Sequence, residues 1–359
     1  MFQPGVAEAA GLSARHLRMS EDEAAALVAE RFGIVGRASR LAAEKDDTFR
    51  ILAADGSAHV LKASNPGEDP AEIDLQLALL EHVRQADPSL PVPRVVRSLD
   101  GERLLAHADR AGQPRSTRLL TYLAGTLLSD TASTAAHRGK VGEMQARLRL
   151  AMAGFSHPAD CRRLPWDMLH LLGLEPLLAH IEEADRRTAL RRGLDRFAAI
   201  EAALAACRRQ VLHNDFSRGN ILVDRGAPAF VTGIIDFGDA VRTAIAVDVA
   251  TALANQFPAA ATVDLFGDGR DLLRGYLRVA DLTEQELVLI PHLAMARLVA
   301  RILLTVWRSK LFTDNVAYIM RNTHQSWAQL DWFLERPVEE ISAQLLHAHG
   351  ARPHMLTKE

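Results

Sequence analysis

The chain has 359 residues, of which 48% are hydrophobic and 24% are charged, and its formal net charge is -3. This composition is typical of a folded globular protein and excludes a disordered chain, and the small net charge gives no basic surface for nucleic acid. A chain of this length is expected to form two lobes or domains rather than one small core.

The sequence contains no segment that we expect to cross a membrane. The most apolar late stretch, 287–307, is interrupted by His292, Arg297 and Arg301, so it predicts a buried or amphipathic helix. The N-terminal residues lack a charged start followed by an apolar core, so we expect no signal peptide. The two cysteines predict reduced thiols rather than a disulfide framework or a metal site. We therefore expect a cytoplasmic protein without a membrane partner, and its oligomeric state stays open.

The first 123 residues predict a small sheet crossed by one helix. A helix at 20–32 begins with an S-x-x-E capping box, and a second helix begins at Pro70 and runs to about residue 83. An Asp-Gly turn at 55–56 predicts a hairpin between the first two strands. The strands are expected at 48–53, 58–62, 95–99 and 116–123.

The rest of the chain predicts a larger, mostly helical lobe. Helices are expected at about 132–154, 166–182 and 185–207, and again from 244, around an island of strands and loops at 211–239. This layout predicts an α+β, protein-kinase-like two-lobed fold, with a small antiparallel-sheet N-lobe and a larger, mostly helical C-lobe. The expected divisions are an N-terminal helical extension (1–35), a nucleotide-binding N-lobe (36–123) and a catalytic, acceptor-binding C-lobe (124–359).

The island VLHNDFSRGNILVDRGAPAFVTGIIDFGDA carries the pattern of a phosphotransferase site. Its parts are His213-x-Asp215-x4-Asn220, an apolar hairpin of 221–224 and 230–235, and Asp236-Phe237-Gly238. Phosphoryl transfer needs a carboxylate that orients the attacking hydroxyl and accepts its proton, which Asp215 can provide. Hard oxygen ligands must hold Mg²⁺ against the phosphates, and Asn220 and Asp236 can supply them. Each motif alone is weak, but their order and spacing together predict this chemistry.

Lys62 is the candidate cation for the phosphates of the nucleotide. Only five of the 42 basic residues are lysines, and this one falls inside a predicted strand. The alternative is an edge-strand lysine that points into water. Its acidic partner is expected on the next helix, where Glu72 and Asp74 are the candidates and Gln76 is the more internal alternative. The turn at 44–48 has no glycine-rich signature, so a loop that covers the phosphates there would have to use backbone amides.

At these residues the sequence resembles the aminoglycoside phosphotransferase family, a kinase-like group that includes choline, homoserine and fructosamine kinases. Several stretches are similar to its hydroxylysine kinase-like branch, and together they cover most of the chain. They are EKDDTFRI (44–51), HVLKASN (59–65), RLLTYLAGT (118–126), FSHPAD with LPWDM (155–168), HNDFSRGNILV (213–223), GIIDFGDA (233–240) and, more weakly, DNVAYI (314–319).

The resemblance implies roles for the matching positions. Asp215 would be the catalytic base, and Lys62 would contact the phosphates. Asn220 and Asp236 would hold Mg²⁺. The backbone of the hinge, Thr121, Tyr122 and Leu123, would meet the purine of ATP or GTP.

Further roles are implied around this centre. Asp239 would face the acceptor, and His213, Asp248 and Asp74 would support the residues that react. For Asp248, a simple acid at a helix start is the alternative. The family usually has His-Gly-Asp where this chain has Asn214; if the position needs a left-handed backbone, Asn tolerates it best after Gly.

The predicted function is a small-molecule kinase that transfers the γ-phosphoryl group of ATP or GTP to an amino alcohol or an amino acid such as hydroxylysine. An ammonium-bearing acceptor would suit a cleft that holds Asp215 and Asp239. The alternatives are an aminoglycoside or other small-alcohol phosphotransferase and a catalytically degenerate nucleotide-binding protein. A protein kinase is disfavoured, because no A-P-E-like segment follows 236–238. In the late helices we interpret four residues as helix surface and core rather than acceptor contacts: Arg297, Arg301, Trp307 and Arg308.

Overall fold

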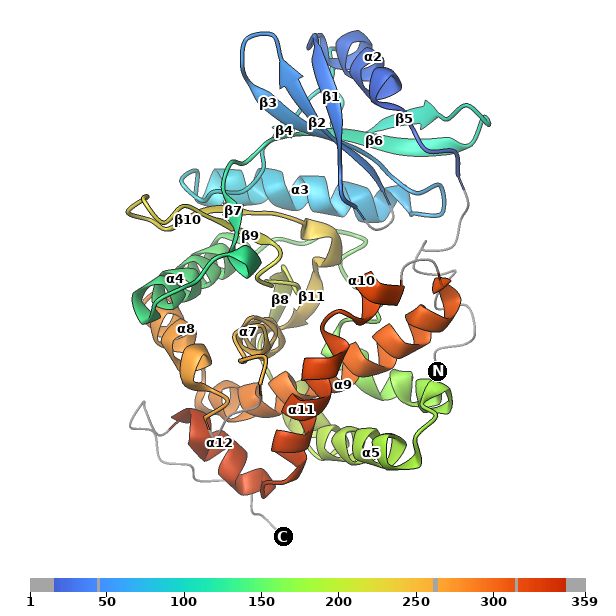
Figure 1. The fold of residues 1–359 in the computed structure, drawn as a ribbon. Coiled ribbons are helices and arrows are strands. Elements are labelled where there is room, and N and C mark those ends of the chain that lie inside the picture. The colour runs from blue at the N-terminus through green and yellow to red at the C-terminus, as the bar shows by residue number, and fades with distance from the viewer. Residues whose placement is uncertain (1–15, 44–45, 261–263, 314–315, 347–359) are drawn as a thin grey trace.

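The computed structural model describes residues 16–43, 46–260, 264–313 and 316–346, and it has two lobes (Figure 1). One lobe is built on an antiparallel sheet, and the other is mostly helical. The predicted kinase-like, two-lobed α+β fold is confirmed. The expected divisions at 35/36 and 123/124 stay predictions. Residues 1–15, in which we expected no signal peptide, lie outside the described part of the chain.

The N-lobe sheet has the strand order β1-β2-β3-β6-β4, with β5 beside β6, and all of its neighbours are antiparallel. Its strands are β1 (Gly36–Leu41), β2 (Asp47–Ala53), β3 (Ala58–Ala63), β4 (Val95–Val96), β5 (Leu105–Ala108) and β6 (Pro114–Thr121). β2, β3 and β6 follow the prediction closely. β4 is shorter than predicted, and β5 was not predicted because four residues give too little alternation to indicate a strand.

Two helices pack on this sheet, α2 (Glu21–Phe32) and α3 (Pro70–Ala86). The capping box of α2 forms as predicted, since the Ser20 hydroxyl accepts from the Glu23 amide and the Ser20 amide donates to the Glu23 carboxylate. The buried side of α2 shares one apolar cluster with Phe49 of β2 and its neighbours in the sheet. This helix is therefore part of the N-lobe core. α3 lies between the sheet and the C-lobe (Figure 1).

The C-lobe contains α4 (Ala135–Ala151), α5 (Ala184–Ala198), α6 (Glu201–Ala205), α7 (Ile245–Ala254), α8 (Gly267–Leu277), α9 (Glu284–Leu311), α10 (Val316–Met320), α11 (Thr323–Leu334) and α12 (Val338–Leu346). The helix predicted at 166–182 is a run of 3₁₀ turns, η2 (Met168–His180), which contains Pro176. The backbone leaves the helical range at His170, so η2 consists of two helical stretches joined by a kink. The helix predicted at 185–207 divides into α5 and α6.

The predicted island forms short strands at the junction of the lobes. Those of the island are β8 (Arg209–Leu212), β9 (Ile221–Val223) and β10 (Val231–Ile234), with the 3₁₀ turn η3 (Phe237–Asp239). Outside the island, β7 (Thr126–Leu127), the 3₁₀ turn η1 (Leu128–Asp130) and β11 (Val241–Ala244) complete this region. The β9–β10 hairpin is the one predicted, and β7 extends it to three strands. β8 pairs with β11, so both ends of the island are tied together.

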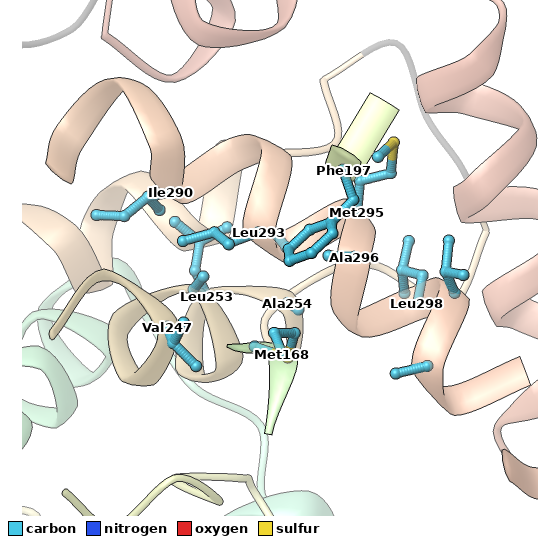
Figure 2. Packing of buried hydrophobic residues seen from close by; sticks show 14 of the residues in the cluster. Met168, Phe197, Val247, Leu253, Ala254, Ile290, Leu293, Met295, Ala296 and Leu298 are labelled. Atoms are coloured by element: carbon cyan, nitrogen blue, oxygen red, sulfur yellow. The ribbon is translucent and has the colours of Figure 1, made fainter. Parts of the chain in front are cut away.

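The C-lobe core is organised around α9. Apolar side chains from α9, α7 and α5 meet there, among them Leu293, Leu253 and Phe197 (Figure 2). By length and composition alone, α9 is apolar enough to cross a membrane, but 83% of its most apolar 18-residue window is buried inside the protein, as in a core helix. His292, one of its polar interruptions, is buried and its Nε2 lies 3.0 Å from Oγ of Ser342. α9 therefore behaves as the buried helix that its interruptions predict.

Candidate active site

The loop between β8 and β9 carries His213 and Asp215, and hydrogen bonds fix its shape. The Asp215 amide donates to Nδ1 of His213 at 3.3 Å, so the imidazole proton lies on Nε2. Nε2 donates to the carbonyl oxygen of Ile235 at 3.1 Å. The His213 ring also packs edge-on against Phe237, with ring centroids 4.8 Å apart. His213 therefore joins the Asp215 loop to the segment that carries Asp236.

The Asp215 carboxylate is oriented on both sides and still reaches solvent. Nδ2 of Asn220 donates to its Oδ2 at 2.7 Å and to its backbone oxygen at 3.0 Å. Nη2 of Arg297 lies 3.4 Å from its Oδ1. The Asp215 side chain remains 29% exposed. A carboxylate held in this way can accept a proton from a hydroxyl bound beside it.

Asn214, which stands where the family has glycine, has a left-handed backbone with φ of 60°. Its amide donates to Oδ1 of Asp248 at 2.8 Å, and Oδ2 of Asp248 accepts from Nε2 of Gln145 at 2.9 Å. Asp248 lies in the first turn of α7, and burial raises its pKa. Its carboxylate therefore anchors the backbone of the loop, which is more than a helix-start acid does.

The backbone at residue 214 leads to a matched pair of variants. Both Asn214→Gly and Asn214→Ala remove a side chain that is fully buried and whose polar atoms have no hydrogen-bond partner among the described residues. Glycine adopts this φ without strain, whereas alanine is expected to be less stable than glycine by about 1 kcal/mol. Urea unfolding of the two variants measures the difference, and we expect Asn214→Gly to keep its activity. Equal stability of the pair would show that the left-handed backbone is not required.

Lys62 and Asp236 face each other at the junction of the lobes. Lys62 lies on β3, which is flanked by β2 and β6, so it is not the edge-strand lysine of the alternative interpretation. Its Nζ is 3.8 Å from Oδ1 of Asp236, with exposed side-chain fractions of 22% and 55%. Asp236 itself has a left-handed backbone, with φ of 62°. The strand and the loop thus place a cation and a carboxylate at one point.

The partner expected for Lys62 on α3 is not found there. Both carboxylate oxygens of Asp74 accept from Arg103, at 2.8 Å each. Oε2 of Glu72 accepts from Arg162 at 2.7 Å. The expectation that Glu72 or Asp74 pairs with Lys62 is therefore wrong, because α3 directs both acids toward arginines from other segments. The supporting role implied for Asp74 finds no contact with the predicted site residues in the described part of the chain.

Arg162, which sequence reasoning did not single out, connects α3 with the segment after Asp236. Its guanidinium pairs with Glu72 and donates to the backbone oxygens of Gly238 and Ala240, the second at 2.9 Å. Its side chain is only 7% exposed. Arg162 therefore positions the 236–240 segment against the N-lobe. No local sequence pattern indicates these contacts, because the partners lie 90 positions before Arg162 and 76 and 78 positions after it.

Asp239 lies in η3, beside Asp236 in sequence, and is half-buried. Burial, together with the charges of Asp215 and Asp236, raises the pKa of Asp239 to about 6. Arg297 and Arg162 act in the opposite direction. The three carboxyl groups concentrate negative charge at one place, and such a cluster attracts cations.

Arg297 is a site residue that sequence reasoning assigned to helix surface and core. It is 5% exposed and comes from α9, 82 positions beyond Asp215. Nη1 donates to the carbonyl oxygen of Trp166 at 2.6 Å, and the guanidinium lies 5.0 Å from the centre of the indole ring. The one sequence signal was a basic residue inside the apolar stretch 287–307.

The hinge leaves β6 at Thr121 and Tyr122 and continues through Leu123. The Tyr122 amide donates to the Ala58 oxygen at 3.0 Å, and the Thr121 amide donates to the Arg94 oxygen at 2.9 Å. The Arg94 amide in turn donates to the Thr121 hydroxyl at 2.8 Å. The Arg94 amide therefore bonds to the Thr121 side chain and does not bond to the Thr121 carbonyl oxygen.

Two of the stretches noted in the sequence are only partly described. Residues 44–45 of the predicted phosphate-covering turn lie outside the described residues, as do 314–315 of DNVAYI. The rest of the turn is anchored, since Oδ2 of Asp46 lies 3.2 Å from Nη2 of Arg118. The role of this turn toward the phosphates stays a prediction.

The donor set at the junction fits a hard cation. Nδ2 of Asn220 is committed to Asp215, so the other atom of that amide, the oxygen Oδ1, is left for a ligand. Asp236 adds an exposed carboxylate. Mg²⁺ is usually held by one or two such side chains together with phosphate oxygens, rather than by a complete protein cage. Asn220 and Asp236 therefore match the ligands that a nucleotide-bound metal requires.

This fold and this arrangement of site residues define a kinase-like phosphotransferase. The family model described as the phosphotransferase enzyme family, APH, matches residues 38–282. The chain belongs to this family, and the resemblance noted in the sequence is confirmed. The protein is a small-molecule kinase that acts on an alcohol group.

Known relatives agree with this assignment, and solved structures share the fold. A hydroxylysine kinase of Mus musculus is 25% identical over 349 residues, covering 90% of this chain and 92% of that protein. A homoserine kinase of Acidiphilium cryptum is 32% identical over 260 residues, covering 70% of this chain and 75% of that protein. A microcompartment-associated aminopropanol kinase shares the fold, with a TM-score of 0.68, 22% identity and coverage of 86% of this chain and 96% of that one. An amicoumacin kinase solved with AMP-PNP and Ca²⁺ has a TM-score of 0.66, 18% identity and coverage of 89% and 95%.

Proposed function

We propose that this protein transfers the γ-phosphoryl group of a magnesium-bound nucleoside triphosphate to the hydroxyl group of an amino alcohol or amino acid. The observation that carries the proposal is the meeting of Lys62, Asp215, Asn220 and Asp236 at the junction of the lobes. Lys62 and Asp236 are 3.8 Å apart, and Asn220 is bonded to Asp215 at 2.7 Å. The relatives named hydroxylysine kinase and homoserine kinase support an acceptor that carries both a hydroxyl and an ammonium group.

In this proposal Asp215 orients the acceptor hydroxyl and takes its proton. Asn220 keeps one carboxylate oxygen in place and Arg297 lies beside the other, so the base cannot rotate away. Asp248 holds the backbone of the loop through the Asn214 amide, and His213 packs the loop against the segment that carries Asp236. The catalytic benefit is positional, because phosphoryl transfer depends mainly on alignment and on stabilisation of charge.

Asn220 and Asp236 would hold Mg²⁺, which when bound neutralises charge on the phosphates. Lys62 would contact the same phosphates from β3. Its present distance of 3.8 Å from Asp236 brings the two groups close enough to share one phosphate chain. Arg162 keeps the Asp236 segment fixed while this happens, through its bonds to the backbone at 238 and 240.

In this proposal the Thr121 carbonyl oxygen faces the purine, which would favour adenine as the base of the nucleotide. The Thr121 carbonyl oxygen is an acceptor, and adenine presents an amino donor at the position where guanine presents an acceptor oxygen. The Thr121 hydroxyl supports this by taking the Arg94 amide at 2.8 Å. We therefore propose ATP as the preferred donor, and competition between ATP and GTP in the transfer assay tests this choice.

Asp239 is proposed to bind the ammonium group of the acceptor, which gives a pH dependence. Its pKa is about 6, so below that pH the carboxyl group is neutral and above it the carboxylate is charged. An acceptor that keeps its ammonium charge should therefore bind about 10-fold more tightly at pH 7 than at pH 5. Calorimetry without nucleotide and metal measures the affinity. The Asp239→Asn variant should show no such change, and a wild-type affinity independent of pH would contradict this role.

The proposed reaction is tested by following nucleoside diphosphate release over a panel of acceptors. The panel contains hydroxylated amino acids, amino alcohols, simple sugars and aminoglycosides, each with ATP and with GTP. We expect release to depend on Mg²⁺ and to be fastest with a hydroxylated amino acid or a small amino alcohol. Efficient phosphorylation of sugars or aminoglycosides alone would replace the proposed acceptor class.

A further inference from the structure

Arg301 is a cation near Arg297 that has no role in the proposed reaction. It lies one helical turn beyond Arg297 on α9, and residues four apart share one face of a helix. It is half-buried. Nη1 donates to Oγ of Ser326 at 3.4 Å and Nη2 donates to Oδ1 of Asn255 at 3.5 Å, both at the long limit of a hydrogen bond.

Several buried arginines of this protein have carboxylate partners. Examples are Arg115 with Asp47 at 2.8 Å, Arg118 with Asp46 at 3.2 Å, and Arg162 with Glu72 at 2.7 Å. Among the residues that the structure describes, Arg301 has no carboxylate within ion-pair distance, although the charge of Asp215 reaches it. Burial first, and then the like charge of Arg297, lower the pKa of Arg301 to about 10. A half-buried guanidinium that makes only two long hydrogen bonds, and no ion pair among the described residues, can bind an anion.

We propose that Arg301 binds a carboxylate group of the acceptor, so that the substrate is a hydroxylated amino acid rather than a simple amino alcohol. The inference rests on the proposed function, because it concerns the molecule that Asp215 would deprotonate. The planar guanidinium has five donors, of which two are used weakly here, and it suits two carboxylate oxygens. Arg297 adds positive charge to the same helix face. Asp239 offers the complementary charge for the ammonium group, so the cleft carries both signs that an amino acid needs.

The test uses acceptors that differ only in the carboxylate. L-Homoserine is compared with 3-aminopropan-1-ol, and 5-hydroxylysine with 1,5-diaminopentan-2-ol. Wild-type protein is expected to have a higher kcat/KM for the carboxylate-bearing member of at least one pair. In Arg301→Gln, this preference is expected to fall by about 30-fold or more, mainly through KM for the amino acid. Arg301→Lys should restore part of it, because the charge is kept and the fork is lost.

The ratio of the two kcat/KM values does not depend on the folded fraction, so it stays readable if a variant is less stable. Arg274→Gln, an exposed arginine paired with Asp271 on α8, is the matched control and should leave the ratio unchanged. Equal or better use of the decarboxylated acceptors by wild-type protein would overturn the inference and leave the kinase reaction standing. So would an Arg301→Gln variant that loses both acceptors by the same factor. If wild-type protein phosphorylates none of the four compounds, both the inference and the proposed acceptor class fail.

Discussion

The Asp215→Asn variant is expected to lose about 10²- to 10⁴-fold in kcat, because an amide cannot accept the proton of the acceptor hydroxyl. The substitution keeps the shape of the side chain, so the bonds to Asn220 and the 3.4 Å approach of Arg297 can be retained in part. We therefore expect nucleotide affinity to stay close to that of the wild type. Diphosphate release under saturating substrates gives kcat, and calorimetry gives the affinity.

The matched control is Asp224→Asn, an exposed aspartate in the turn of the β9–β10 hairpin that follows the same loop. It changes the net charge equally and should leave turnover unchanged. An Asp215→Asn protein that turns over at nearly the wild-type rate would show that another group takes the proton. Loss of nucleotide affinity together with activity would instead indicate that Asp215 has a structural role in the loop.

Asp236→Asn is expected to uncouple the nucleotide from the metal. The carboxylate is the one strongly charged ligand that the proposed Mg²⁺ site takes from the protein, and its removal costs several kcal/mol of charge stabilisation. Asparagine tolerates the left-handed backbone at φ of 62°, so the fold of this segment should survive. The predicted result is nucleotide binding that no longer strengthens when Mg²⁺ is added, together with a loss of turnover of about 100-fold or more.

Titrations of nucleotide with Mg²⁺ and with a chelator, on Asp236→Asn and on the Asp224→Asn control, provide the measurement. The control should keep the full metal dependence of the wild type. If Asp236→Asn kept it as well, the metal would have to be held elsewhere. The same variant also removes the counter-ion that lies 3.8 Å from Lys62, so a small change in metal-free nucleotide affinity is expected.

The parts of the site that could be predicted are those built from neighbouring residues. A short loop and a hairpin bring Asp215, Asn220 and Asp236 together in one island. Both elements can be recognised in the sequence. The left-handed backbone at Asn214 was also foreseeable, since few residue types tolerate it. The sheet was predicted from the alternation of apolar and polar residues, and the long buried helix from its apolar residues at helical spacing.

What sequence could not provide depends on packing between distant segments. Arg297 reaches Asp215 only because α9 crosses the C-lobe beneath the loop. The acids of α3 were expected at Lys62, but they are taken by Arg103 and Arg162, which come from later segments. A helix pattern shows which positions share a face, but it does not show which charge that face will meet. The cytoplasmic location expected from the sequence stays a prediction.

The destination of the transferred phosphoryl group tests the proposed kinase reaction most directly. Phosphorus NMR of wild-type protein with ATP, Mg²⁺ and 5-hydroxylysine or L-homoserine follows the γ-phosphate through the reaction. We predict that its signal is replaced by that of a phosphate monoester, in a quantity equal to the ADP formed, and that Asp215→Asn slows formation of this product by about 10²- to 10⁴-fold. Release of inorganic phosphate alone, or formation of the monoester at an undiminished rate by Asp215→Asn, would contradict the account.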